Sequence, residues 1–232
     1  PSNHDDRFDR VRVRQAMSGL GLDAAGLART AGRMARAAEA LRARAAEVGA
    51  RAITREVLNG AATGDLLIDR DAFAAVERDT QMRLLADGLC AVASAVHRPR
   101  AEALEALLDR ALGGAGGTLH GAELTVTDDR IRVAREFAAL SVARATARPG
   151  ALWDGRWRIG EAIAPGLTVR PLGPDGWAQR PDNAPRSVPA RAAHAWPALF
   201  AGDRLVACGP LGVGPAGAIV LCEGPARRPP AT

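Results

Sequence analysis

The sequence predicts an α+β protein: a mainly helical domain that ends in a small β-meander, followed by a smaller mixed α/β tail domain. Two observations predict this arrangement. Apolar residues recur at three- and four-residue steps through most of residues 24–112, which is the helical period, and then alternate with polar residues, which is the strand period. After about residue 148 glycine and proline become frequent, which indicates a linker and a second group of short elements.

One long helix is predicted to start at Asp23 and to end at the Asn59-Gly60 pair. Its apolar stripe is mostly alanine and consists of Leu27, Ala31, Met34, Ala38, Leu41, Ala45, Val48 and Ala52. The Asp23 carboxylate can accept hydrogen bonds from the free amides of the first turn. Asn59 and Gly60 both tolerate the left-handed backbone that commonly closes a helix. We therefore expect a single helix across this whole stretch.

Four shorter elements and a meander follow before the linker. DLLID (65–69) is a short strand candidate, and the next stretch, up to Val96, reads as two consecutive helices. The second of them stacks Met82, Leu85, Leu89 and Val92 on one face. Pro99 opens a third helix, PRAEALEALLDRALGG, which Gly-Gly ends. The run GGTLHGAELTVTDDRIRVAREF then alternates around turn residues and predicts a meander of two or three strands.

The tail has its own predicted elements. WRIG and LTVRPL are read as strands, VPARAAHAWPALF as a helix, and RLVACG with AIVLC as a terminal hairpin. Trp153, Trp157, Trp177 and Trp196 fall in this otherwise aromatic-poor region. They are either base-stacking platforms or the core of a small domain, and core packing is favoured because tryptophan is largely buried on average.

Composition limits the classes of partner. The chain has 232 residues and a formal net charge of +5, and all 31 of its basic residues are arginine. A basic protein favours an anionic partner, nucleic acid before membrane, because no segment pairs a basic face with Trp or Phe. The three cysteines and four histidines are scattered, so neither a disulfide framework nor a metal site is expected. No run of 18 apolar residues and no signal peptide is present, so we expect a cytoplasmic protein.

The sequence contains no self-contained catalytic motif. GxGxxG after a strand, the Walker loop, HExxH and GxSxG are all absent, and GPLGVGPAG reads as a turn rather than a phosphate loop. His120 and His194 are interpreted as structural or exposed residues. Asp5, Asp6 and Asp9 can in principle hold Mg²⁺, but without a second acidic segment they fit an acidic first helical turn better.

The opening stretch PSNHDDRFDRVRVRQ carries the most specific pattern. Arg7, Arg10 and Arg14 fall at helical spacing, and three guanidiniums on one face form a clamp for phosphate or carboxylate. The competing interpretation is a surface helix whose arginines pair with the neighbouring aspartates. Spacing alone favours the surface helix.

The same run resembles the segment that closes the ATP-pyrophosphatase domain of bacterial tRNA(Ile)-lysidine synthetases, in which Asp-Pro-Ser-Asn, an aromatic residue, Arg-Asn and Ile-Arg are characteristic. The matching residues are Pro1, Ser2, Asn3, Phe8, Arg10 and Arg14. Val11 stands where the family usually has Asn. The resemblance continues more weakly through the long helix, GDLLIDRDAF, the meander region and PALFAGDRLVA. It implies three parts: the end of the catalytic domain (1–20), a helical tRNA- and substrate-binding domain with the meander (21–140), and a small C-terminal tRNA-binding domain (151–232).

The resemblance also implies a reaction. The family uses ATP, with Mg²⁺, to adenylate C2 of the wobble cytidine in the CAU anticodon of an isoleucine tRNA, and lysine then displaces AMP. The Ser-Gly-Gly-x-Asp-Ser nucleotide loop of the family has no counterpart in this sequence, so the chain is expected to be a fragment without ligase activity of its own. Asn3, Arg10 and Arg14 are expected at the edge of the ATP and lysine site, and no residue is assigned a catalytic role.

The remaining expectations concern the RNA partner. The candidates for contact with tRNA phosphates are Arg7, Arg12, Arg170, Arg180, Arg191 and Arg204. A homodimer is possible. The alternative function is a free-standing basic RNA-binding or scaffold module without catalysis.

Overall fold

The computed structural model describes residues 12–13, 16–17, 19–21, 23–185 and 187–222. The chain divides after Ala46 into two compact units, 1–46 and 47–232. Helices and antiparallel sheets build the described chain, so the α+β class is confirmed at that level. The finer division at residues 20, 140 and 151 stays a prediction. Among the described residues no helix is both long and apolar enough to cross a membrane.

The long helix exists but ends earlier than predicted. Helix α2 spans Ala24–Ala52, and Asp23 caps it by accepting hydrogen bonds from the amides of Ala25 (3.1 Å) and Gly26 (2.8 Å). The prediction that it continues to Asn59-Gly60 is wrong, because strand β1 occupies Ile53–Leu58. This segment is rich in β-branched residues, and Asn-Gly is the preferred two-residue hairpin turn.

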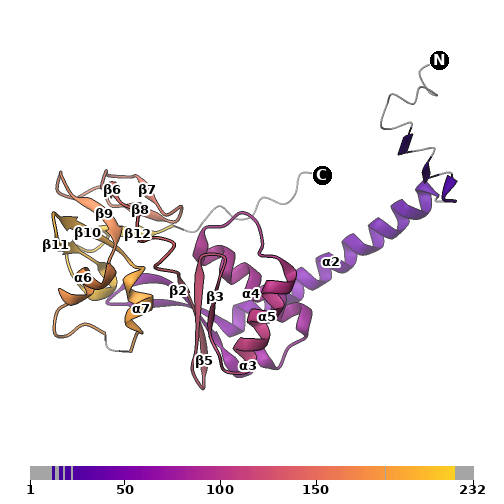
Figure 1. Cartoon of the computed structure of the whole chain (residues 1–232), viewed down its shortest axis with the longest axis horizontal. Coiled ribbons are helices and arrows are strands. Elements are labelled where there is room, and N and C mark those ends of the chain that lie inside the picture. The colour runs from indigo at the N-terminus through magenta and orange to yellow at the C-terminus, as the bar shows by residue number, and fades with distance from the viewer. Residues whose placement is uncertain (1–11, 14–15, 18, 22, 186, 223–232) are drawn as a thin grey trace, which may run out of the picture. The chain divides into compact units, whose positions relative to one another are not determined.

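A five-stranded antiparallel sheet forms the centre of unit 47–232, with strand order β1-β2-β5-β4-β3. Figure 1 labels three of its strands, β2, β5 and β3. Strand β2 (Ala61–Asp69) folds back on β1, and Asn59 and Gly60 have φ of 49° and 74° in the turn between them. The predicted strand DLLID is therefore the second half of a longer one. The meander is confirmed as three strands, β3 (Gly117–Leu119), β4 (Ala122–Val126) and β5 (Arg130–Arg135).

The three predicted helices after β2 are confirmed and pack on this sheet. They are α3 (Arg70–Ala74), α4 (Arg78–Ala93) and α5 (Ala101–Leu112). Asp69 caps α3 through the amide of Ala72 at 2.9 Å. An ideal Cβ on Gly88 of α4 would lie 3.5 Å from Leu66 of β2, so Leu66 faces the helices. Because side chains alternate along a strand, Asp65 points to the opposite face of the sheet.

The tail consists of short elements in two further sheets. The four-stranded sheet has the order β11-β10-β9-β6 and the three-stranded sheet the order β12-β8-β7. The elements are β6 (Ala145–Thr146), β7 (Leu152–Trp153), β8 (Trp157–Ile159), β9 (Thr168–Pro171), α6 (Gly173–Ala178), α7 (Ala190–His194), β10 (Pro197–Ala201), β11 (Arg204–Ala207), the 3₁₀ turn η2 (Gly209–Leu211) and β12 (Ile219–Leu221). Strands β8 and β9 confirm the predicted WRIG and LTVRPL strands.

Two predictions for the tail are wrong. The helix expected over VPARAAHAWPALF stops at His194, and Pro197–Ala201 is a buried strand between β9 and β11. The proline disfavours helical backbone at the residue before it. The expected hairpin of RLVACG with AIVLC does not form either. Strand β11 pairs with β10 across the Gly202-Asp203 turn, and β12 pairs with β8.

Three of the four tryptophans are core residues, as the sequence favoured. Trp153, Trp157 and Trp196 are 6%, 2% and 1% exposed. Trp196 packs with Leu172, Phe200 and other residues of one apolar cluster, and Trp153 and Trp157 belong to a second. Trp177 is only partly buried, against the first cluster. It is therefore the most exposed of the four tryptophans.

Candidate nucleic-acid interface

The candidate site at the start of the sequence lies mostly outside the described residues. Asn3, Arg7, Arg10 and Arg14 belong to that part of the chain, as do Asp5, Asp6 and Asp9. Arg12 is described and is exposed on a short helical segment. The anion clamp and the surface helix that competes with it therefore both stay predictions.

Arg170 is held inside the tail. Its side chain is 12% exposed, and its Nη2 lies 2.5 Å from Oδ2 of Asp175. The guanidinium also stacks on the ring of Phe200, with Cζ 3.5 Å from the ring centroid. The hydrogen bond from Arg170 is the largest cause that lowers the pKa of Asp175. This arginine is neutralised locally and joins β9 to α6.

Arg180 is exposed and follows directly from α6. Its guanidinium carbon lies 4.7 Å from the centroid of the Trp177 ring, and its Nη1 donates a hydrogen bond to the Trp177 carbonyl at 2.9 Å. No carboxylate pairs with Arg180 among the residues that the structure describes. The charge of Arg180 is therefore available to an outside anion, and its guanidinium lies over the indole.

His194 and Phe137 complete an aromatic cluster around Trp177. The His194 ring lies 6.4 Å from Trp177 and 5.7 Å from Phe137, in both cases edge to face. Burial lowers the pKa of His194, and the charge of Asp175 opposes this only partly. The imidazole is therefore neutral at pH 7 and acts as an aromatic surface rather than a cation. The side chains of Trp177, Arg180, His194 and Phe137 are all half-buried or exposed.

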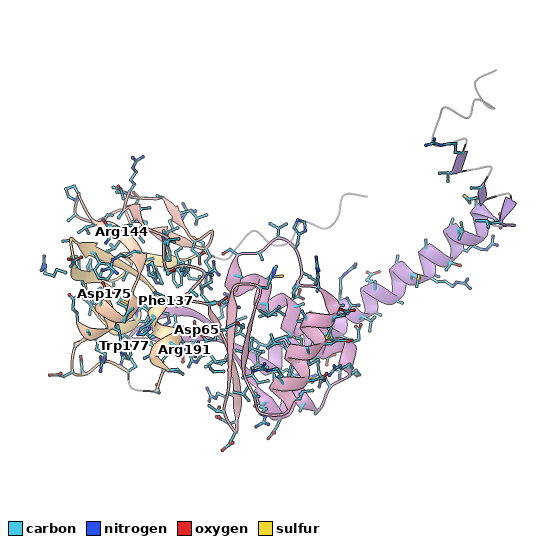
Figure 2. The ribbon with its side chains drawn as sticks, viewed as in Figure 1. Asp65, Phe137, Arg144, Asp175, Trp177 and Arg191 are labelled. Carbon is cyan, nitrogen blue, oxygen red and sulfur yellow. The ribbon has the colours of Figure 1, made fainter. Side chains whose placement is uncertain are left out.

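Arg191 lies on α7, one turn before His194. Its side chain is 76% exposed, and its Nη2 lies 3.1 Å from Oε1 of Glu123 on β4. Arg191 also borders a groove of about 830 Å³ between α5 and strands β3 and β4, together with Arg110. Figure 2 shows Arg191, Trp177 and Phe137 in the region of α6 and α7.

Arg204 is exposed at the start of β11, beside the Gly202-Asp203 turn. Gln179 ties this turn to the end of α6: its Nε2 donates to the Asp203 carbonyl at 2.9 Å, and its Oε1 accepts from the Leu205 amide at 2.9 Å. Arg180 follows Gln179, and Arg204 lies between the two residues that Gln179 binds. The segments that carry Arg180 and Arg204 are thus held together.

A group of buried charges on the sheet was not found by sequence reasoning. Arg132 of β5 donates from Nη1 and Nη2 to the two carboxylate oxygens of Glu56 (2.5 and 2.7 Å), and its Nη1 also lies 2.8 Å from Oδ2 of Asp65. A break in the β1–β2 register beside Glu56 accompanies the positive φ of Gly64 and helps to set this geometry. Burial raises the pKa of Asp65 to about 7, although Arg132 opposes this.

The tail reaches this charged group through the hairpin WDGRW (153–157). Asp154 and Gly155 form its turn with positive φ, and Arg135 donates to both carboxylate oxygens of Asp154 at 3.0 Å. Arg156 donates to the Gly64 carbonyl at 2.8 Å, and its own Nε has no hydrogen-bond partner. Burial lowers the pKa of Arg156 to about 10, so it stays charged at pH 7.

The buried groups pair with one another and have a structural effect, with Asp65 about half ionised at pH 7 because burial raises its pKa to about 7. Three guanidiniums (Arg132, Arg135 and Arg156) lie with three carboxylates (Glu56, Asp65 and Asp154), and every one of these side chains is at most 11% exposed. Buried charges are stable only when they are paired, so each partner depends on the others. The group holds the hairpin WDGRW on the five-stranded sheet. Only the Asp-Gly turn signal in the hairpin was readable from the sequence.

Among the described residues, no three His, Cys, Asp or Glu side chains are grouped as metal ligands. Three of the six arginines proposed from the sequence, namely Arg180, Arg191 and Arg204, lie exposed on the tail. Arg180 and Arg204 are brought together through Gln179, and Arg191 shares α7 with the aromatic cluster.

Comparison with known proteins gives one informative similarity. No family model matches the chain. The chain is 36% identical over 214 residues to a curated tRNA(Ile)-lysidine synthase from Ruegeria pomeroyi. The aligned region covers 89% of this chain but only 48% of that relative, so the chain spans about half the length of the protein it matches. The resemblance to bacterial tRNA(Ile)-lysidine synthetases that the sequence indicated is thereby confirmed over most of the chain.

Proposed function

We propose that this chain is the tRNA-holding part of a tRNA(Ile)-lysidine synthetase. In this proposal the complete enzyme uses ATP, with Mg²⁺, to adenylate C2 of the wobble cytidine of the CAU anticodon, and then joins lysine to that carbon. The 36% identity over 214 residues is the observation that carries the proposal. The ATP and lysine site would be bordered by Asn3, Arg10 and Arg14.

The exposed arginines of the tail support RNA as the partner. Arg180, Arg191 and Arg204 present guanidiniums to solvent, and the chain carries a net charge of +5. Phosphate contacts of this kind fix the position of an RNA and supply affinity, whereas base contacts supply specificity. We infer that the tail binds the body of the tRNA and that other parts of the enzyme recognise the anticodon.

The first test is the reaction itself. The chain alone, incubated with ATP, lysine and a transcript of the isoleucine tRNA with the CAU anticodon, should form no lysidine, because the nucleotide-binding loop of the family is not in this sequence. The product is measured by mass spectrometry of the digested tRNA. Lysidine formed by the chain alone would overturn its assignment as the non-catalytic part.

The second test is binding. The chain should bind the same transcript, and log Kd should rise with log salt because counterions are released from the RNA. The triple variant Arg180→Gln/Arg191→Gln/Arg204→Gln should lower that slope by about 2 to 3, which is one contact per arginine. Arg130→Gln is the control, because Arg130 is an exposed arginine at the start of β5, outside the tail. An unchanged slope in the triple variant, or no tRNA binding at all, would refute the proposal.

A further inference from the structure

We propose that Trp177 and Arg180 form a stacking site for one unpaired nucleobase of the bound RNA. This inference rests on the proposed tRNA-binding function and deepens it, because it assigns a base contact to a region that otherwise supplies phosphate contacts. Three features of the structure support it: the exposure of Trp177, the position of the Arg180 guanidinium over its ring, and the rigid packing beneath them.

The first feature is the exposure of Trp177. All four tryptophans are described, and the other three are at most 6% exposed inside the two tail clusters. Trp177 packs against the cluster that contains Leu172 and Phe200, and it also contacts Arg180 and His194. The arginine beside the core tryptophan Trp157 is buried, whereas Arg180 is exposed to solvent, so a ligand can reach the Trp177–Arg180 pair.

The second feature is the arrangement of Arg180 over the indole. Its guanidinium lies 4.7 Å from the ring centroid and is fixed by the hydrogen bond to the Trp177 carbonyl. The guanidinium therefore lies over the ring, and the side chain as a whole is exposed. Guanidinium planes and aromatic rings are the surfaces on which unpaired bases stack in RNA complexes. An unpaired base would reach this pair from the solvent.

The third feature is the support. Helix α6 is packed so closely that an ideal Cβ on Gly176 would lie 2.6 Å from Leu172 and 2.9 Å from Phe200. His194 adds an edge contact to the Trp177 ring, and Phe137 in turn makes an edge contact with His194. His194 is neutral at pH 7 because burial lowers its pKa, so it does not compete with Arg180 for a phosphate. The stack is thus held in place before a base arrives, which reduces the entropy lost on binding.

The nature of the surface indicates an unpaired base rather than a duplex. A stacking platform needs a base whose face is accessible, and within a helix both faces are covered by neighbouring bases. Stacking on Trp and Arg is tolerant of base identity, because every base has a π-face. The site is therefore expected to bind single-stranded RNA of any sequence, with preference for the bases that stack most strongly.

The test uses the complete chain, a single-stranded RNA tetranucleotide and the tRNA transcript. The tetranucleotide should quench tryptophan fluorescence, and a blunt-ended RNA duplex of similar charge should quench it less. Trp177→Leu should abolish the quenching and weaken oligonucleotide binding about tenfold, without changing the salt slope. Arg180→Lys keeps the charge but removes the planar guanidinium, so it should weaken oligonucleotide binding several-fold and leave the salt slope unchanged. Arg180→Gln should in addition lower the slope by about 1.

The controls separate this inference from the proposed function. Arg158→Lys changes an exposed arginine of β8 that donates to the Gly150 carbonyl, and it should leave quenching and affinity unchanged. Arg180→Lys changes only an exposed side chain, so it tests the inference even if Trp177→Leu does not fold. If the transcript binds as proposed but Arg180→Lys and Trp177→Leu bind like the wild type, the stacking site is refuted and the tRNA-binding function stands. If the tetranucleotide quenches but the transcript does not bind, the stacking site stands and the tRNA function fails. If neither RNA binds, both fail.

Discussion

Gly64 provides the sharpest test of how the tail is held on the sheet. Its φ is +83°, a region that costs other residues about 1 to 2 kcal/mol. An added Cβ would lie 2.6 Å from Cζ2 of Trp157 and 3.1 Å from both terminal nitrogens of Arg156. The Gly64 carbonyl also accepts the hydrogen bond from Arg156. Gly64→Ala therefore strains the backbone and pushes the hairpin WDGRW off the sheet.

Gly60 is a matched control in the same β-hairpin. Its φ is +74°, and no atom lies within 4 Å of an ideal Cβ there, so Gly60→Ala should cost only the backbone strain of about 1 to 2 kcal/mol. Gly64→Ala adds overpacking of about 1 to 3 kcal/mol and the loss of a hydrogen bond to a charged group, about 1.5 to 3 kcal/mol. The extra cost at Gly64 is therefore at least about 2 kcal/mol.

Urea unfolding followed by tryptophan fluorescence measures this difference directly, because Trp157 lies at the contact. In a thermal melt the extra cost corresponds to a midpoint at least about 4 °C lower for Gly64→Ala than for Gly60→Ala. If the two variants unfold within about 1 kcal/mol of each other, the hairpin is not held by this contact, and the account of the tail given above is wrong.

Three further predictions follow from the buried groups. Burial raises the pKa of Asp65 to about 7, so the protonated carboxyl stabilises the folded protein. The difference in free energy of unfolding between wild type and Asp65→Asn should therefore be greatest below about pH 4 and should fall by up to about 4 kcal/mol by pH 7. Urea unfolding across this pH range measures the difference, and a pH-independent value would contradict the prediction. Asp154→Asn places at φ of 47° a residue that tolerates this backbone, but it leaves Arg135 without its carboxylate. The free energy of unfolding should therefore fall by about 3 kcal/mol, and a loss under 1 kcal/mol would show that the pair is dispensable. Burial raises the pKa of Cys208 to about 12, so iodoacetamide at pH 8 should label the half-buried Cys222 well before Cys208 in peptide maps, and equal labelling rates would show that the tail opens readily.

Local sequence signals predicted the helices of residues 24–112 well, but they missed α6 and failed where two signals competed. The apolar stripe of α2 ends at Ala52, but Asn59-Gly60 was interpreted as the end of the helix, so the helix was extended over residues that form β1. The β-branched residues and the Asn-Gly turn were present in the sequence and decided the outcome. At Pro197 the proline likewise outweighed the apolar run that suggested a helix.

Pairing between distant segments could not be read in the same way. Strand β12 pairs with β8, about 60 residues earlier, and no local signal distinguishes that partner from the nearby β11. The buried charges have the same character, since Glu56, Asp65, Arg132 and Arg156 meet only after the sheets form. By contrast, Arg180 and Trp177 are three residues apart, and their stacking is a local feature that spacing could have indicated.

The ion pairs beneath the hairpin WDGRW restrict which parts can be exchanged between related proteins. Asp154 and Arg156 belong to the tail, while Glu56, Asp65, Arg132 and Arg135 belong to the sheet. Each set is formally neutral by itself, but Arg135 loses its carboxylate partner when Asp154 is absent. A chimera joined anywhere between residues 136 and 152 would inherit one set without the other. Its junction would bury an uncompensated charge even if every apolar contact were preserved. A tail that is transplanted between related proteins should therefore include the sheet residues that pair with the hairpin WDGRW.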